Sequence, residues 1–147
     1  MKFSHIVASR DGLFLVNRDA SQRAAEGSFF GVTIKDRFVY CFDSVKPSTT
    51  DETCGCIVRY PVSNDGLGPR ETMITGLHAG CHQIDFVGDH LFVVDTYKQQ
   101  ILEIDPAWNT ITPHWPLPQT KDRDHVDYVH FNSIFHRDGQ FNILLHN

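Results

Sequence analysis

The feature that most constrains this chain is a recurring pair of apolar stretches joined by a short polar turn. In each copy, residues that favour strands flank a turn containing Asp or Gly, which is the pattern of a β-hairpin. The three copies are Gly31–Asp43, Gln83–Asp95 and Asn132–Leu145. A chain with this pattern is predicted to be all-β.

The hairpins recur at nearly constant spacing. Phe38 and Phe92, each near the start of the second strand of a hairpin, are 54 residues apart, and Phe92 and Ile143 are 51 apart. Further strand-like stretches lie between the hairpins at Cys56–Tyr60, Glu71–Thr75, Gln100–Asp105 and Thr110–Thr112. Each unit therefore has about four strands, as in a blade of a β-propeller.

Helical patterns are weak throughout the sequence. Only Asp19–Glu26, which contains two consecutive alanines, has any helical character, and no stretch has a sustained apolar face of helical period. The continuous apolar runs Phe92–Val94 and Ile143–Leu145 instead indicate inner strands buried on both faces.

The 147 residues form one predicted domain, residues 1–147, with fewer than three whole repeats. A propeller needs about four to eight blades to close. We therefore predict three blade units, namely 3–18 together with 129–146, then 29–76, then 82–116, closing to six blades as a homodimer. Two alternatives are that the chain is a piece of a longer propeller, or that it folds as a small β-sandwich or barrel.

The sequence resembles the six-bladed β-propellers of the NHL-repeat and gluconolactonase-like superfamily. The residues that carry the resemblance are Gly88–Thr96 followed by Lys98–Asp105. The resemblance concerns architecture. Gluconolactonase-like propellers hold a metal in the central channel, where it polarises a lactone or ester carbonyl and activates water. The resemblance implies that Asn132 and Asp85 are candidate ligands, although no Glu ligand is found near the start of a strand.

The repeat places His82 and His130 in matching positions, each just before an inner strand. Asn132 lies two residues beyond His130, on the same side of an extended strand, and Asp85 lies near the matching point of the preceding unit. These four side chains could hold a divalent metal, either calcium through oxygen atoms or zinc through imidazole. The alternative is that they hydrogen-bond the ends of the strands.

A second group of candidate ligands is the run His78–His82, which contains two histidines and Cys81. No second pair of Cys or His stands at zinc-finger spacing, and Cys54 and Cys56 could approach the run only through the fold. Buried or loop thiols without a ligand role are the favoured interpretation.

Two classes of function remain. The first is a propeller that binds a small molecule or a protein at the channel mouth. The second is a metal-dependent hydrolase or lyase, so the sequence leaves enzyme activity undecided. A net charge of −5 argues against nucleic-acid binding, and no apolar run is long enough to span a membrane. Without an export signal, the four cysteines are interpreted as reduced thiols of a cytoplasmic protein.

Overall fold

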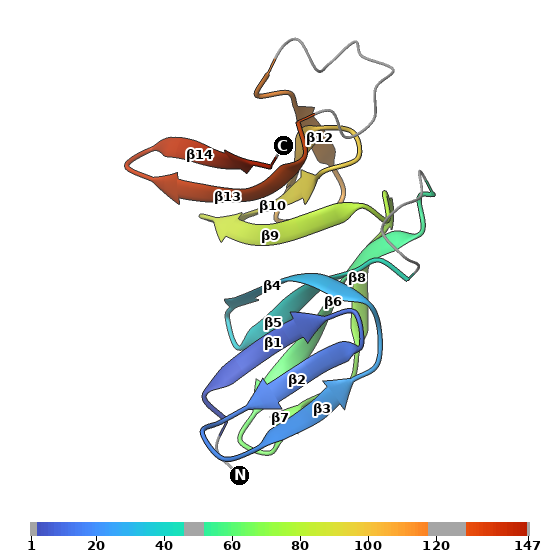
Figure 1. Cartoon of the computed structure of the whole chain (residues 1–147), viewed down its shortest axis with the longest axis vertical. Helices are drawn as coiled ribbons and strands as arrows, with labels where there is room; N and C mark the ends of the chain where they lie inside the picture. The colour runs from blue at the N-terminus through green and yellow to red at the C-terminus, as the bar shows by residue number, and fades with distance from the viewer. Residues whose placement is uncertain (1–2, 46–51, 118–128, 147) are drawn as a thin grey trace.

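The computed structural model describes residues 3–45, 52–117 and 129–146. Within these ranges the protein is all-β, with antiparallel strands and no helix, as predicted (Figure 1). The same ranges accordingly hold no helix long and apolar enough to cross a membrane.

The strands form four sheets that follow one another along the chain. The first sheet has the order β1 (His5–Ser9), β2 (Gly12–Val16), β3 (Ser21–Ala25). In the second, β4 (Phe29–Lys35), β5 (Phe38–Asp43), β6 (Gly55–Ser63) and β8 (Glu71–Leu77) lie side by side, and the short β7 (Gly66–Leu67) pairs with the end of β6. The third contains β9 (Cys81–Val87), β10 (His90–Asp95), β11 (Gln100–Ile104) and β12 (Ile111–His114), and the fourth contains β13 (Phe131–Arg137) and β14 (Gln140–Leu145).

All three predicted hairpins are confirmed as β4–β5, β9–β10 and β13–β14. Two of their turns have a left-handed backbone at both central residues. Asp36 and Arg37 have φ of 49° and 66°, and Asp138 and Gly139 have φ of 52° and 75°. Positive φ at both central residues gives the turn the twist of the flanking strands. Sequence and local geometry therefore agree at these turns.

The sheets stack on one another in chain order, and their first strands are neighbours. Strand β1 contacts β4, β4 contacts β9, and β9 contacts β13. Each junction has an apolar core, represented by Leu13 and Phe29 between the first two sheets, Phe42 and Ile84 at the next junction, and Phe131 with other residues at the last. The second and third sheets cover nearly the same residues as the predicted units 29–76 and 82–116.

Strands β5 and β10 are buried on both faces. In β10, Leu91 and Val93 belong to the core shared with the second sheet, whereas Phe92 and Val94 belong to the core shared with the fourth. This confirms the prediction of an inner strand at Phe92–Val94. Within the described part of one chain no further sheet covers β14, and Leu144 is 60% exposed, so burial of Ile143–Leu145 stays a prediction that depends on a second copy.

The segment with weak helical character is a strand. Residues Ser21–Ala25 form β3, which pairs with β2 along its length. The first sheet therefore has three strands, one more than the hairpin expected from the sequence. Residues 3–18 and 129–146 lie in separate sheets of this chain, and their combination into one blade across two copies stays a prediction.

Gly31 permits the close approach of β4 to β9. A Cβ atom added at Gly31 would lie 2.5 Å from the carbonyl oxygen of His82 and 2.7 Å from the amide nitrogen of Ile84. Both are backbone atoms of β9, so they cannot move aside as the end of a side chain could. A glycine within a strand often marks such a contact between backbones.

We predict that Gly31→Ala lowers the free energy of unfolding by roughly 2 kcal/mol, because the methyl group overpacks the junction of the second and third sheets. Urea denaturation followed by fluorescence measures the change. Gly88→Ala is the control, because a Cβ added at Gly88 has no atom within 4 Å and so causes no overpacking. The φ of 60° at Gly88 adds some backbone strain to this control. A Gly31→Ala protein as stable as the unmodified protein would contradict the close approach.

Glu103 links three neighbouring strands of the third sheet. Its carboxylate contacts Nδ1 of His90 on β10 at 2.5 Å and Nε2 of His114 on β12 at 2.7 Å. Hydrogen bonds from His90 and then from His114 lower the pKa of the Glu103 carboxyl below its ordinary value of 4.5. A carboxyl with a lowered pKa stabilises the fold above its ordinary pKa, and this contribution disappears as the pH falls through the lowered value.

We predict that Glu103→Gln reduces the loss of stability on acidification below pH 4.5, the ordinary pKa of this group. The urea midpoint, measured as a function of pH for both proteins, tests this. The matched control is Glu26→Gln, which removes an exposed glutamate that contacts Arg23. Parallel pH profiles for the Glu103→Gln variant and the unmodified protein would contradict the prediction.

Candidate site at the start of the inner strands

Three of the sheets begin with the same irregularity. The first strand of each has a β-bulge next to its start, at Phe30 in β4, at His82 and Gln83 in β9, and at Asn132 in β13. A bulge turns a side chain away from the regular alternation of the strand. Phe30, His82 and Asn132 are 52 and 50 residues apart, so the repeat extends to the bulge itself.

A continuous row of side chains runs from the turn that follows β1 across the starts of β4, β9 and β13. The guanidinium of Arg10, in the β1–β2 turn, lies 5.5 Å from the ring of Phe30. Phe30 stacks on His82 at 5.5 Å between ring centroids. His82 contacts His130 edge to face at 5.5 Å, and His130 contacts His146 at 5.8 Å. We refer to Arg10, Phe30, His82, His130 and His146 as the histidine row.

The histidine row is accessible to solvent. Arg10 and His146 are exposed, and the three rings between them are partly buried. His146 lies opposite His130 because β13 and β14 pair, and the amide of His146 donates to the carbonyl of His130 at 3.1 Å. The row therefore combines one guanidinium, three imidazoles and one apolar ring on a common surface.

Two of the four predicted site residues, His82 and His130, are brought together. Asn132 lies at the bulge of β13, two residues beyond His130. Asp85 is used differently, because its Oδ1 accepts hydrogen bonds from Oγ1 of Thr33 at 3.0 Å and from the amide of Phe86. The carboxylate of Asp85 thus links β9 to β4. Asp85 lies three residues beyond His82, about 10 Å further along β9.

Sequence reasoning missed Arg10, Phe30 and His146. Phe30 could have been found from the period, since it precedes His82 by one repeat. His146 could have been found from the register of the last hairpin, which places it opposite His130. Arg10 lies in a turn whose position depends on the packing of the first sheet, and the sequence holds no comparable signal for it.

The run His78–His82 is divided between two environments. Nδ1 of His78 lies 2.8 Å from Oδ2 of Asp95, which is fully buried at the end of β10 and also accepts hydrogen bonds from the side chain of Gln100 and the amide of Lys98. His82 contacts the histidine row instead. Burial raises the pKa of the Cys81 thiol, so Cys81 is a poor source of a thiolate ligand or nucleophile.

Asp95 has a counterpart in the second sheet. Asp43, at the end of β5, accepts hydrogen bonds from Arg70 at 2.8 Å and from the amides of Val45 and Ser28. The two carboxylates hold the chain where it leaves equivalent strands. Their repetition indicates a role in the fold, and we assign the contact between His78 and Asp95 to that role.

The atoms of the histidine row that could bind a metal are imidazole nitrogens. Across the described ranges, no group of three or more His, Cys, Asp or Glu is placed to hold a metal ion. The carboxylate of Asp85, which was expected to bind the metal, instead accepts a hydrogen bond from Thr33. The geometry thus adds no support to the predicted calcium or zinc, and we derive no chemistry through a metal.

Comparison with known proteins gives no assignment. No protein-family model matches the sequence, and no curated protein matches it either.

Proposed function

We propose that this protein is a binding module of the β-propeller type, which closes as a homodimer and holds a small anionic molecule against the histidine row. The observation that carries the proposal is the row itself, in which Arg10 of the β1–β2 turn continues the line of rings at the starts of β4, β9 and β13. Loops and strand ends on a rigid β-scaffold are common places for binding.

The arrangement of the sheets supports a propeller. Two antiparallel sheets are stacked in chain order, one of four strands and one of four long strands with the two-residue β7 added, and neighbouring sheets meet through their first strands. In a propeller, blades of this kind surround a channel that their first strands line. The histidine row then lies at one mouth of that channel.

The two end sheets support closure by a second copy. Among the residues that the structure describes, the fourth sheet has two strands, and Phe135 and Leu144 are 59% and 60% exposed on it. At the other end of the stack, Val7 of β1 is 45% exposed. A two-stranded sheet is marginal in water, and exposed apolar side chains mark a surface that binds another protein. The last sheet of one copy and the first sheet of the other would complete one blade, so that two copies close six.

The chemistry of the row favours an anion. A guanidinium and imidazole N–H groups donate hydrogen bonds to carboxylate or phosphate oxygens, and Phe30 offers a face for a planar group. The row itself contains no carboxylate, although the chain carries a net charge of −5.

The four cysteines are free, which fits the reducing cytoplasm in which we expect the protein to act.

The predicted homodimer is tested by light scattering of protein eluting from a size-exclusion column. We expect a dimer, and we expect Leu144→Asp to give a monomer, because a charge would be buried at the junction between copies. The matched control is Ile34→Asp, which alters an equally exposed residue of the second sheet and should leave the dimer intact. A folded, monomeric unmodified protein would contradict closure by a second copy.

The predicted anion site is tested with benzoate, which has both a carboxylate and a flat ring. Addition of benzoate should shift the imidazole signals of His82 and His130 in ¹H–¹⁵N spectra. Arg10→Ala should weaken binding by about tenfold, because a hydrogen bond to a charged group is lost. His136→Ala removes an exposed histidine outside the row and serves as the control.

Two results would count against the anion site. One is equal binding of benzoate by the Arg10→Ala variant and the unmodified protein. The other is stoichiometric binding of zinc that His82→Ala abolishes, which would instead favour the metal site predicted from the sequence.

A further inference from the structure

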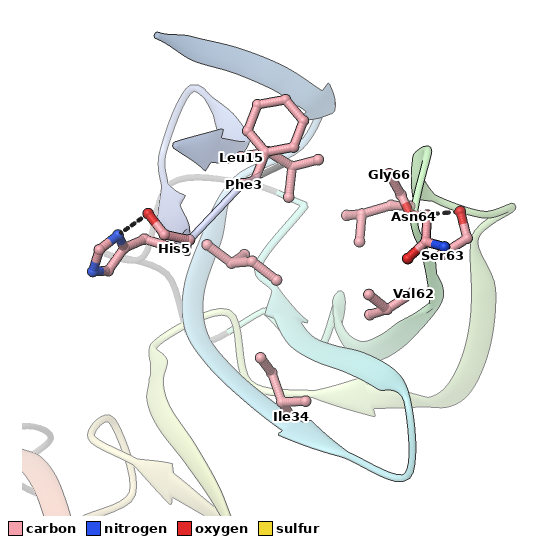
Figure 2. A pocket seen from close by; sticks show the side chains of 11 residues that line it. Phe3, His5, Leu15, Ile34, Val62, Ser63, Asn64 and Gly66 are labelled. Carbon is pink, nitrogen blue, oxygen red and sulfur yellow. Dashed lines mark hydrogen bonds between the residues drawn. The ribbon is translucent and has the colours of Figure 1, made fainter. Parts of the chain in front are cut away.

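A second concave surface lies far along the strands from the histidine row, between the first sheet and the β6–β7 hairpin. This open cavity has a volume of about 660 Å³, within the range of sites for small molecules. Figure 2 shows Phe3 and Leu15 on one side of this cavity, Ile34 on another, and the Ser63–Gly66 turn across from them. The residues that line it are Phe3, Ser4, His5, Ile6, Leu15, Ile34, Val62, Ser63, Asn64, Gly66 and Leu67.

The apolar part of the wall is fixed by the protein core. Ile6, Val62 and Leu67 pack against the cluster of buried residues between the first two sheets, and Leu15 is only 6% exposed. These side chains cannot close the cavity without leaving the core. Ile34, by contrast, is 61% exposed and faces the opening, where an occupant would cover it.

One side chain of the wall can carry a charge, the imidazole of His5, which is exposed and points away from the cavity (Figure 2). The lining has no Asp, Glu, Lys or Arg. Oγ of Ser4 lies 2.8 Å from Nδ1 of His5, and Oγ of Ser63 donates to the carbonyl of Gly66 at 3.2 Å. The side-chain amide of Asn64, in an exposed turn, supplies both a donor and an acceptor. A cationic occupant would therefore lose its hydration without gaining a partner of opposite charge, and an anionic occupant would find only the outward-pointing imidazole of His5.

We infer that this cavity binds a small, uncharged and mainly apolar molecule that carries one hydrogen-bonding group. The apolar wall contacts the apolar part of the molecule, and the Ser63–Gly66 turn hydrogen-bonds its polar group. The inference is independent of the histidine row, since the two sites share no residue. It is also independent of the charge of the ligand proposed there.

The test uses N-phenyl-1-naphthylamine, a neutral fluorescent molecule with two apolar ring systems and one N–H group. We expect saturable binding of one molecule per chain, with increased emission. Ile34→Asp should weaken binding at least about tenfold, because it removes apolar contact and places a charge beside the probe. Ile111→Asp, in β12 and outside the cavity, is the matched control and should bind the probe normally.

A second variant distinguishes a loss of the binding site from a loss of folding. Asn64→Trp fills the opening from an exposed turn and should also abolish saturable binding, with an unchanged circular dichroism spectrum. Octanol should displace the probe, and octanoate should do so far less effectively. Unsaturable binding, equal binding by the Ile34→Asp variant and the unmodified protein, or better displacement by octanoate would each overturn the inference.

Discussion

The contact between the first strands of neighbouring sheets is the constraint on which the rest of this structure depends. Backbone lies against backbone where β4 meets β9, and a glycine is needed at Gly31 to allow it. This approach brings the second and third sheets close enough for Phe42 and Ile84 to share one apolar core. Hydrogen bonds then cross the same junctions, from Thr33 to Asp85 and from the amide of Ile134 to the side chain of Gln83.

The local pattern of apolar and turn-forming residues was sufficient to predict most of the strands. The hairpin turns were recognised because Asp and Gly occur where the backbone needs positive φ, and the period was recognised because whole sheets repeat. Strand β3 was missed because Ser21–Ala25 has neither alternation nor β-branched residues, and only its pairing with β2 makes it a strand. β14 is exposed within one chain because burial depends on a neighbouring sheet, which no property of the strand itself can supply.

The candidate site was predictable only in part, for a related reason. His82 and His130 lie within two residues of the same place in the repeat, so the sequence could predict that they come together. Asp85 lies near the same place in the repeat, but its carboxylate accepts a hydrogen bond from Thr33. This contact depends on how β9 packs on β4. Bulges at Phe30, His82 and Asn132 change which side chains face the end of the sheets, and the sequence pattern of a strand does not reveal a bulge.

The unequal sheets at the two ends of the stack have a consequence for how the chain behaves at high concentration. The contact proposed between the last sheet of one copy and the first sheet of the next joins two different surfaces. Such a contact ends in a ring only if the angle between successive copies brings the free ends together, and it otherwise continues into a filament. The curvature set by the stacked sheets would then decide whether the protein remains a discrete particle or polymerises.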